Sequence, residues 1–555
     1  MTHHRLIKSL IAYAAACLLL SDSNAGLVTG AIMDADTGKP VAARLYIQNA
    51  TGEWYFAESD SPQGMAIRYA KTNWINPRAV EVHTTLSAHP FRVELPPGRY
   101  TVTTERGKEY HPLTQEVLVG NQPLELKIKL RRWVNMAARG WFSGDGHVHR
   151  SLSELPTLLL AEDLNVALPQ SYWAIQDKTR PTPSNKFFGF QSSATTNEAS
   201  NDLEISPSLI KADATHVIWP LNTEYEIFKV GDAMQNLGAV FILNHKEPFK
   251  LGAPPMRPIA EEARRQGALL DMDKCNWNWS MMLPPIMNID LYELANNHLW
   301  RAEYAFTNFN VPAPAFMNLP DDGRSGGERD WINYTFNSYY ALLDCGFRMR
   351  PTAGTASGVH PVPPGFGRVY VHCPRGFTYE RWIKGLGEGR SFVTTGPMLL
   401  AEINGEVPGG KFQLTPGRSR RVKLSGTVLS EEPVQFVEVL VNGKMQKRIA
   451  LQSKRNRNGA YEAKFKIAED ISGTSWVALR CWEDRADGRV RFAHTAPTWF
   501  DDTTLPLRPR RVEVQWLAER MRQEVISKTD VLSPEAVAEY QEALKHYESL
   551  EQTAR

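Results

Sequence analysis

Alternating apolar and polar positions mark the first part of the chain, from Gly26 to about Arg132. The stretch "LVTGAIMDADTGKPVAARLYI" holds two such runs joined by an Asp/Thr/Gly/Pro turn, "FRVELPPGRYTVTTERG" repeats the pattern around Pro-Pro-Gly, and "LELKIKL" alternates strictly. Residues two apart on a strand share a face, so each run predicts a half-buried strand. We therefore expect a small antiparallel β-sandwich over residues 26–132.

The pattern changes over residues 133–400, where apolar runs alternate with helical periods. This alternation is typical of α/β construction, and a barrel-like α/β domain fits it. Strands are expected at 216–222, 239–245 and 289–295, and helices at 154–164 and 330–346. Asp330 is a suitable cap for the start of the second helix, and Gly346 for its end.

Period-2 alternation returns after residue 400 in "QFVEVLVNG", "AKFKIA" and "SWVALRCW". It predicts a second β-sandwich over 401–505, followed by a helical segment over 506–555. In that last segment Ser533 is a helix cap and Pro534 takes the first helical position. Apolar residues then recur on one helix face, which indicates a helix packed on the rest of the molecule: Val537, Tyr540, Leu544 and Tyr547.

Composition and the N-terminal segment predict the number of domains, the kinds of partner and the cellular destination. The chain has 555 residues, enough for about three or four domains, and 63 Lys+Arg against 61 Asp+Glu. This balance gives no single-sign field for nucleic acid, which we exclude as a partner. Arg5 and Lys8 precede the apolar run "LIAYAAACLLL" and the small-residue site "SNA", which predicts a secretory signal over 1–25 and a secreted or periplasmic protein.

Membrane anchoring is disfavoured by the same segment. The apolar run is short for a transmembrane helix, and no later run is long enough to span a bilayer. A lipid anchor at Cys17 is disfavoured by Ala14 and by the apolar residues that follow the cysteine. The other four cysteines, Cys275, Cys345, Cys373 and Cys481, form no C-x-x-C pair, so a zinc knuckle is not indicated and one or two disulfides remain open.

The candidate chemistry begins at "WFSGDGHVH", residues 141–149. On a strand, His147 and His149 would present both imidazoles on one side, the arrangement that a pair of metal ligands requires. The same spacing also occurs in pairs of histidines that are only surface or core residues. Asp145 either braces an imidazole or makes the turn before the strand.

Three further strand ends supply matching residues. "HVIWPLNTEYEI" runs into Glu224, "GAVFILNHKEP" into His245, and "NIDLYELANNH" into Glu293 with His298 close behind. α/β barrel enzymes gather their functional groups at the C-terminal ends of strands. A set of His-x-His, Glu and His suits a divalent metal such as Zn, Mn or Fe.

Each of these residues also has an ordinary structural explanation. Glu224 is alternatively a solvated carboxylate, with Glu226 on the same strand face as its competitor. His245 is alternatively a buried histidine with satisfied hydrogen bonds, and Glu293 a partner of an arginine such as Arg301. The coincidence of four strand ends favours the metal site.

The blocks "GDGHVHR", "WPLNTE" and "FILNHKEP", in that order, resemble the polymerase-and-histidinol-phosphatase (PHP) metallohydrolases. "GHVHRSLSELPTLLLAEDLNVA", "LLDCGFRMRPTAGTASGV" and "YERWIKGLGEGRSFVTTGPMLL" are similar to the CehA/McbA branch, named for a carbaryl hydrolase. "DADTGKPVAARL" and "LPPGRYTV" resemble the carboxypeptidase regulatory-like domain, a non-catalytic β-module. The first resemblance implies a distorted (β/α)7 barrel over 133–400, with metal ligands at His147, His149, Glu224 and His245.

Two blocks depart from the PHP pattern. Where the family has Thr-Asp-His after its second strand, this chain has "VALPQSYW" (166–173). Its closing Ser-Asp-x-His block reads "GTASGVH" (354–360), with Ala356 in the place of the carboxylate. His360 is then either a substitute ligand or a loop histidine, and one or two metal ions per chain fit better than three.

These observations predict an exported metal-dependent hydrolase that acts on an ester, carbamate or phosphoester bond of a small-molecule or glycan-type substrate. Glu293, His298 or His360 would serve as general acid or base, and Arg150 would either bind an anionic substrate group or form a surface salt bridge. A degenerate barrel that works as an exported binding or scaffold module is the alternative. A third possibility is glycan binding by sandwich aromatics such as Trp54, Tyr55 or Trp482, residue types that are more often core.

Overall fold

The computed structural model describes residues 26–183, 205–304, 309, 311–319 and 326–555. The signal sequence expected over 1–25 lies outside the described residues. The chain divides into two compact units, the smaller made of Met1–Arg68, His83–Glu105 and Pro112–Leu130. The larger consists of Tyr69–Val82, Arg106–His111 and Arg131–Arg555. No helix in the described ranges is both long and apolar enough to cross a membrane.

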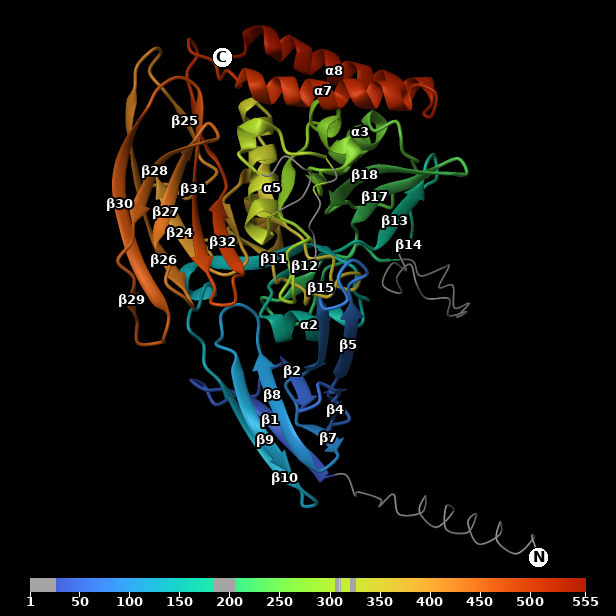
Figure 1. Ribbon diagram of the computed structural model, residues 1–555, viewed down its shortest axis with the longest axis vertical. Helices are drawn as coiled ribbons and strands as arrows, with labels where there is room; N and C mark the ends of the chain where they lie inside the picture. The colour runs from blue at the N-terminus through green and yellow to red at the C-terminus, as the bar shows by residue number, and fades with distance from the viewer. Residues whose placement is uncertain (1–25, 184–204, 305–308, 310, 320–325) are drawn as a thin grey trace, which may run out of the picture. The chain divides into compact units, whose positions relative to one another are not determined.

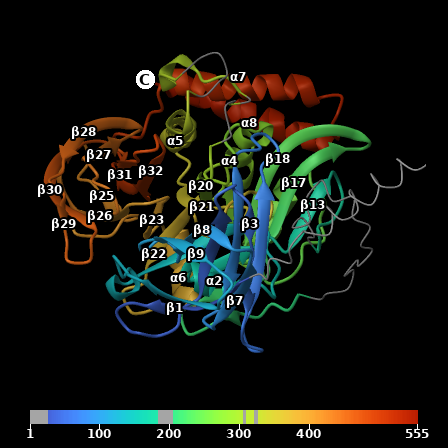
Figure 2. The same cartoon turned by 60° about the horizontal axis from the view of Figure 1, so that its bottom comes forward.

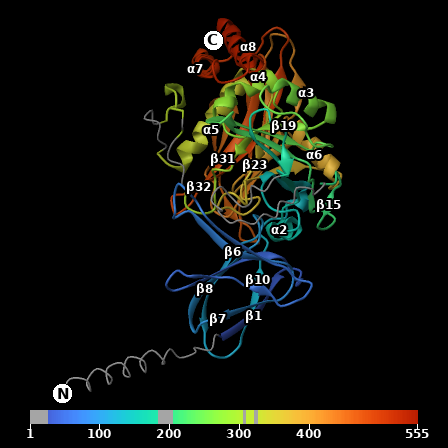
Figure 3. The same cartoon turned by 90° about the vertical axis from the view of Figure 1, so that its right-hand side faces the viewer.

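The smaller unit is built from two sheets, as its alternating sequence predicts (Figure 3). The first sheet has the order β10 (Leu124–Leu130), β1 (Gly26–Asp34), β7 (Phe91–Leu95), β4 (Glu58–Ser59). The second has the order β5 (Ala66–Thr72), β6 (Val80–Leu86), β2 (Ala43–Asn49), β8 (Gly98–Glu105), β9 (Leu113–Val119), with β3 (Trp54–Tyr55) against β2. The parts of β5 and β6 that fall within Tyr69–Val82 are assigned to the larger unit.

One pairing in this unit differs from the expected antiparallel arrangement. β1 and β10 run parallel, with Val28 opposite Leu124 and Asp34 opposite Leu130. They are the first and last strands of the unit, so no hairpin constrains their relative direction. The predicted turn after β1 is confirmed, because Asp34 Oδ1 accepts the backbone N–H groups of Asp36 and Thr37 at 3.1 and 2.7 Å.

The larger unit combines helices with three sheets. A twelve-stranded sheet has the order β15 (Ile210–Lys211), β16 (Val217–Ile218), β12 (Val166–Pro169), β11 (Trp141–Val148), β22 (Arg368–His372), β23 (Ser391–Thr394), β32 (Val490–Thr495), β31 (Ser475–Asp484), β27 (Phe436–Val441), β28 (Lys444–Ala450), with β33 (Thr498–Asp501) and β25 (Lys411–Gln413) beside this path. A seven-stranded sheet has the order β14 (Thr182–Pro183), β13 (Tyr172–Gln176), β17 (Thr223–Val230), β18 (Ala233–Leu243), β19 (Leu269–Met272), β20 (Leu291–Ala295), β21 (Arg350–Ala353). In Figure 2 β17 and β18 lie side by side as a long hairpin, with β13 next to β17.

The third sheet, β24 (Met398–Ile403), β26 (Arg420–Ser430), β30 (Tyr461–Ile471) and β29 (Lys454–Arg455), packs on strands of the twelve-stranded sheet. Side chains from both sheets, such as Val422 and Val477, share one apolar core. A separate sandwich domain over 401–505 stays a prediction. The twelve-stranded sheet is continuous through β23, which pairs with β22 on one side and with β32 on the other.

The α/β organisation of the larger unit is confirmed. Its helices are α2 (Leu155–Glu162), α3 (Arg257–Gln266), α4 (Leu283–Met287), α5 (Glu328–Asp344), α6 (Tyr379–Glu388), α7 (Arg511–Lys528) and α8 (Pro534–Thr553), with 3-10 turns at Ala137–Arg139, Asn278–Met281 and Ala315–Met317. Over the described residues the strands form open sheets, and hydrogen bonds do not close them into a ring.

The ends of two helices test the capping predictions. The N-cap of α5 is Gly327, and Asp330 lies inside the first turn, so the prediction of an Asp330 cap is wrong. Gly346, with φ +93°, directly follows the C-cap residue and ends the helix as expected. Ser533 caps α8 as predicted, since its side chain accepts the N–H of Ala536, and α7 and α8 run side by side (Figure 1).

One expected strand is shorter than predicted. Of residues 216–222 only Val217–Ile218 form a strand, because Pro220 follows closely and cannot donate to a ladder. The next strand, β17, begins at Thr223. Glu224 therefore lies near the start of a strand, and the prediction that it ends one is wrong.

The four cysteines among the described residues, Cys275, Cys345, Cys373 and Cys481, are free and buried. The disulfides left open by the sequence are therefore absent from this part of the chain.

A buried histidine in the larger unit predicts how stability changes with pH. His494 is fully buried, its Nδ1 donates to the carbonyl of Thr495 at 2.7 Å, and its Nε2 lies 2.8 Å from the Tyr340 hydroxyl. Burial lowers its pKa to about 3, whereas an unfolded histidine titrates near 6.5. The unfolded chain therefore binds the extra proton between these values, and stability falls as the pH drops through this window.

Chemical denaturation at two pH values checks this expectation. Between pH 7.5 and pH 5, the wild type should lose about 2 kcal/mol more free energy of unfolding than the His494→Gln variant. Equal losses in the two proteins would show that His494 is not the titrating group.

Candidate metal centre

Strand β11 is buried along its whole length and delivers the His-x-His pair. Gly144 on this strand leaves room for the indole of Trp382, which a Cβ would approach to 2.2 Å. His147 and His149 are 1% and 5% exposed, and their Nε2 atoms lie 3.0 Å apart. The predicted convergence of the two imidazoles is therefore confirmed.

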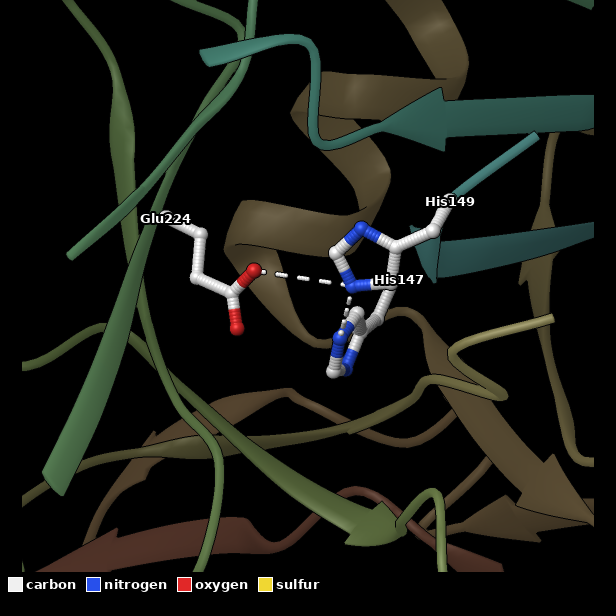
Figure 4. A group of neighbouring side chains, drawn as sticks. All are labelled: His147, His149 and Glu224. Atoms are coloured by element: carbon white, nitrogen blue, oxygen red, sulfur yellow. Dashed lines mark hydrogen bonds and ion pairs between the residues drawn. The ribbon is translucent and has the colours of Figure 1, made fainter. Parts of the chain in front are cut away.

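Glu224 joins this pair from strand β17. Its carboxylate is fully buried, and Oε2 lies 3.5 Å from His149 Nε2. Figure 4 shows the carboxylate pointing at the two rings. One ligand atom from each of the three residues lies within 4.8 Å of the others, a geometry in which a metal ion could be held.

A second group shares His147 with the first. Asp273 and Glu293 each offer a carboxylate oxygen, and with His147 these ligand atoms also lie within 4.8 Å of one another. His147 Nδ1 is 3.2 Å from Glu293 Oε1. Glu293 therefore faces the histidine pair, while Arg301, its alternative partner, is paired with Glu81 at 2.9 Å.

Asp273 is the site residue that the sequence analysis missed. It follows β19 in "ALLDMD", so an apolar run leads directly into a carboxylate, as it does at Glu293. This signal was available in the sequence. Asp271 in the same run is also buried, and both its carboxylate oxygens accept the hydroxyl of Thr352, at 2.9 and 2.8 Å.

The two nitrogens of His147 face different groups. Nε2 faces His149 and Nδ1 faces Glu293. A neutral imidazole carries one N–H, and when that proton is on Nδ1 it can be donated to Glu293 while the Nε2 lone pair is left for a cation. This is the carboxylate–histidine–metal arrangement that fixes a ligand's tautomer.

The electrostatics of the centre favour a bound cation. Burial, reinforced by neighbouring carboxylates, raises the pKa values of Glu293 and Asp271 well above the usual range. Buried carboxylates must be neutralised either by protons or by a cation. The donor set, two imidazoles with carboxylates, is one that Zn, Mn or Fe accepts, so the residues fit the expected metal.

His245 lies just after β18, as predicted, but neither group includes it among the described residues. Its Nε2 lies 2.9 Å from the Thr223 hydroxyl, next to Glu224 on β17. Burial lowers its pKa to about 4, so the ring is neutral near pH 7, the form that binds metals. Its role as a ligand stays a prediction.

The Asp145 carboxylate accepts hydrogen bonds from backbone N–H groups and not from an imidazole. Its carboxylate accepts the N–H groups of His147, Thr355 and Gly365 at 3.1, 3.2 and 2.8 Å, and the Thr355 hydroxyl at 2.6 Å. Burial raises its pKa to about 6. Both explanations offered for Asp145 from the sequence are wrong, because it lies within the strand and fixes the loop beside it.

That loop, residues 355–360, lies along the His-x-His segment. His149 N donates to Ser357 O at 2.8 Å, and Ala356 N to His147 O at 2.7 Å. From the segment Tyr69–Val82 of the same unit, the Tyr69 hydroxyl donates to His360 O at 2.5 Å and accepts the Gly358 N–H at 3.0 Å. The His-x-His backbone is therefore held from the loop side.

The other predicted catalytic residues lie around the centre without joining either group. The His360 ring stacks on Trp74 at 5.0 Å and lies 6.3 Å from the His298 ring. Burial, with the charge of Lys274, lowers the pKa of His298 well below its usual range. Arg150 is buried, with its guanidinium paired to Glu154 at 3.1 Å.

The segment after β12 (Val166–Pro169) begins with Gln170. Its amide nitrogen donates to the carbonyls of Gly146 and Leu168 at 2.9 and 3.2 Å, so this side chain serves the backbone of β11 and β12. Neither an imidazole nor a carboxylate enters the centre from this position.

Comparison with models of known protein families, with curated proteins and with solved structures gives no match. The structure itself defines an α/β protein with several sheets, a C-terminal helix pair and two overlapping buried groups that could hold a metal ion.

Proposed function

We propose that this chain is an exported metal-dependent hydrolase that cleaves an ester, carbamate or phosphoester bond. The observation that carries the proposal is the buried convergence of His147, His149 and Glu224 from β11 and β17. Removing three ionisable side chains from water is costly unless a cation or a proton compensates them. The proposal includes the PHP-type barrel of the CehA/McbA branch, the regulatory-like N-terminal β-module and the secretory signal that the sequence motifs indicate.

Within this proposal the residues have separate tasks. His147, His149 and Glu224 hold the cation, with His245 as the expected further ligand. A divalent ion held there supplies an activated water and polarises a carbonyl or phosphoryl oxygen. Glu293 fixes the tautomer of His147 through the contact at Nδ1.

Proton transfer falls to groups near the centre. Glu293 retains protons to higher pH than an ordinary carboxyl, which suits a general acid. His298 is neutral near pH 7 because its pKa is lowered, so its ring can accept a proton, and His360 is the next imidazole at 6.3 Å between ring centres. Arg150 would bind an anionic substrate group by exchanging its partner Glu154.

A scaffold or binding module is the second candidate function. Gln170 favours it, because the side chain at this strand end bonds to backbone and brings no ligand. A centre with fewer anionic ligands binds cations more weakly, and it can serve stability alone.

Metal analysis and turnover decide between the two. We expect purified protein to contain a stoichiometric transition metal, to hydrolyse activated ester, carbamate or phosphoester substrates, and to lose turnover with a chelator. Turnover should return when the metal is restored. Bound metal without turnover on a broad panel would favour the scaffold, and absence of metal after dialysis against Zn²⁺ or Mn²⁺ would contradict the metal centre.

A further inference from the structure

Lys274 forms a buried ion pair with one residue of the second ligand group. It directly follows Asp273 and is 5% exposed. Its ammonium forms an ion pair with Asp273 Oδ2 and lies 4.0 Å from the centre of the Trp277 ring. A lysine so deeply buried is uncommon, and its carboxylate and aromatic partners are those that stabilise a buried ammonium.

The carboxylates around Lys274 outnumber it. Asp273, Glu293 and Asp271 are all fully buried, and their charges interact with one another. Asp273 Oδ1 has no hydrogen-bond partner among the described atoms, although Oδ2 of the same carboxylate is paired with Lys274. A ligand atom is thus presented to the group formed with His147 and Glu293.

Lys274 and a metal ion would compete for the same carboxylate. A divalent ion bound to Asp273 in this group would lie within a few ångströms of the ammonium that the carboxylate already holds. At such a separation inside a protein the repulsion between the two cations is severe. The first group, His147, His149 and Glu224, has no residue in common with the Asp273–Lys274 ion pair.

We propose that the Lys274 ammonium supplies the positive charge in the group His147, Asp273 and Glu293. It would thereby take the place of a second metal ion and keep the centre mononuclear. This inference rests on the proposed metal centre. It assigns to Lys274 a positioning role: the ammonium holds Asp273 and sets how many metal ions the centre takes. It also assigns a latent second metal site to the second group.

The test is metal stoichiometry, measured by elemental analysis after equilibrium dialysis of the full chain against Mn²⁺. We expect one Mn²⁺ per wild-type chain and two in Lys274→Met, whose unbranched apolar side chain is one heavy atom shorter and carries no charge. The second site should be at least about 100-fold weaker in the wild type. Lys274→Arg, which keeps the charge, should bind one ion, and Asp273→Asn combined with Lys274→Met should return the count to one.

An independent signature is the electron paramagnetic resonance spectrum. With both groups filled, His147 would have to bridge the two ions as an imidazolate, its Nδ1 proton being released to solvent. Two Mn²⁺ ions bridged in this way should couple, so the six-line signal of isolated Mn²⁺ should weaken in Lys274→Met and persist in the wild type. Circular dichroism checks that each variant is folded. Lys274→Gln replaces Lys274→Met if the latter does not fold, with the same expected count of two.

The outcomes separate this inference from the proposed function. One ion in both wild type and Lys274→Met, or two in both, would overturn the role of Lys274 and leave the metal centre intact. No ion in the wild type and one in Lys274→Met would support Lys274 and overturn the first site. No ion in either protein would overturn both proposals.

Discussion

Replacing His149 by alanine should remove the bound metal and reduce turnover at least about 100-fold, more than the loss of an outer-shell partner usually costs. His149 Nε2 lies between His147 Nε2 at 3.0 Å and Glu224 Oε2 at 3.5 Å. Without this imidazole the first group keeps one nitrogen and one carboxylate, too few to hold a transition metal tightly.

Elemental analysis and steady-state kinetics measure this result, with His245→Ala as the comparison. His245 is bonded to Thr223 and stands outside both groups, so its removal should weaken metal binding less. If His149→Ala retained full metal content while His245→Ala lost it, the centre would have to be assigned around His245.

A methyl group at Gly354 is expected to disrupt the same centre by pressing on Glu293 and His147. A Cβ at this glycine would lie 2.1 Å from Glu293 Oε1 and 2.4 Å from His147 Cβ. Both neighbours are buried and cannot withdraw into solvent. We expect Gly354→Ala to lower the free energy of unfolding by about 1–3 kcal/mol, the usual cost of overpacking, and to abolish stoichiometric metal binding.

Gly120 provides the matched control. A Cβ built there meets no atom within 4 Å, so Gly120→Ala should leave both unfolding and metal content unchanged. Thermal unfolding and metal analysis of the two variants make the comparison. Normal metal content in Gly354→Ala would mean that the contact between Glu293 and His147 is not needed for the site.

The sequence predicted much of the candidate site because spacing along a strand is a local property. His147 and His149 are two apart, and this alone places both rings on one side of β11. Glu224 converges on them as expected, although its strand starts at Thr223 and not at residue 216. The error about the strand did not affect the site, because the Glu224 side chain points toward the histidine pair from the start of β17.

What the sequence did not reveal depends on long-range contacts. Asp145 looked like a ligand brace, yet its partners Thr355 and Gly365 lie more than 200 positions further on. The pairing of β1 with β10 joins the two ends of a unit, and no local turn could predict its direction. Asp273 is different: its position after an apolar strand was visible, and only its partners needed the structure.

The division of the chain into two units limits how the protein can be truncated. The backbone passes from one unit to the other after residues 68, 82, 105, 111 and 130, so the first 130 residues are not an independent cassette. Deleting them would also delete Tyr69, the hydrogen-bond partner of His360 and Gly358. Exchange of this leading β-module between related chains would succeed only if the excursions Tyr69–Val82 and Arg106–His111 stayed with the recipient.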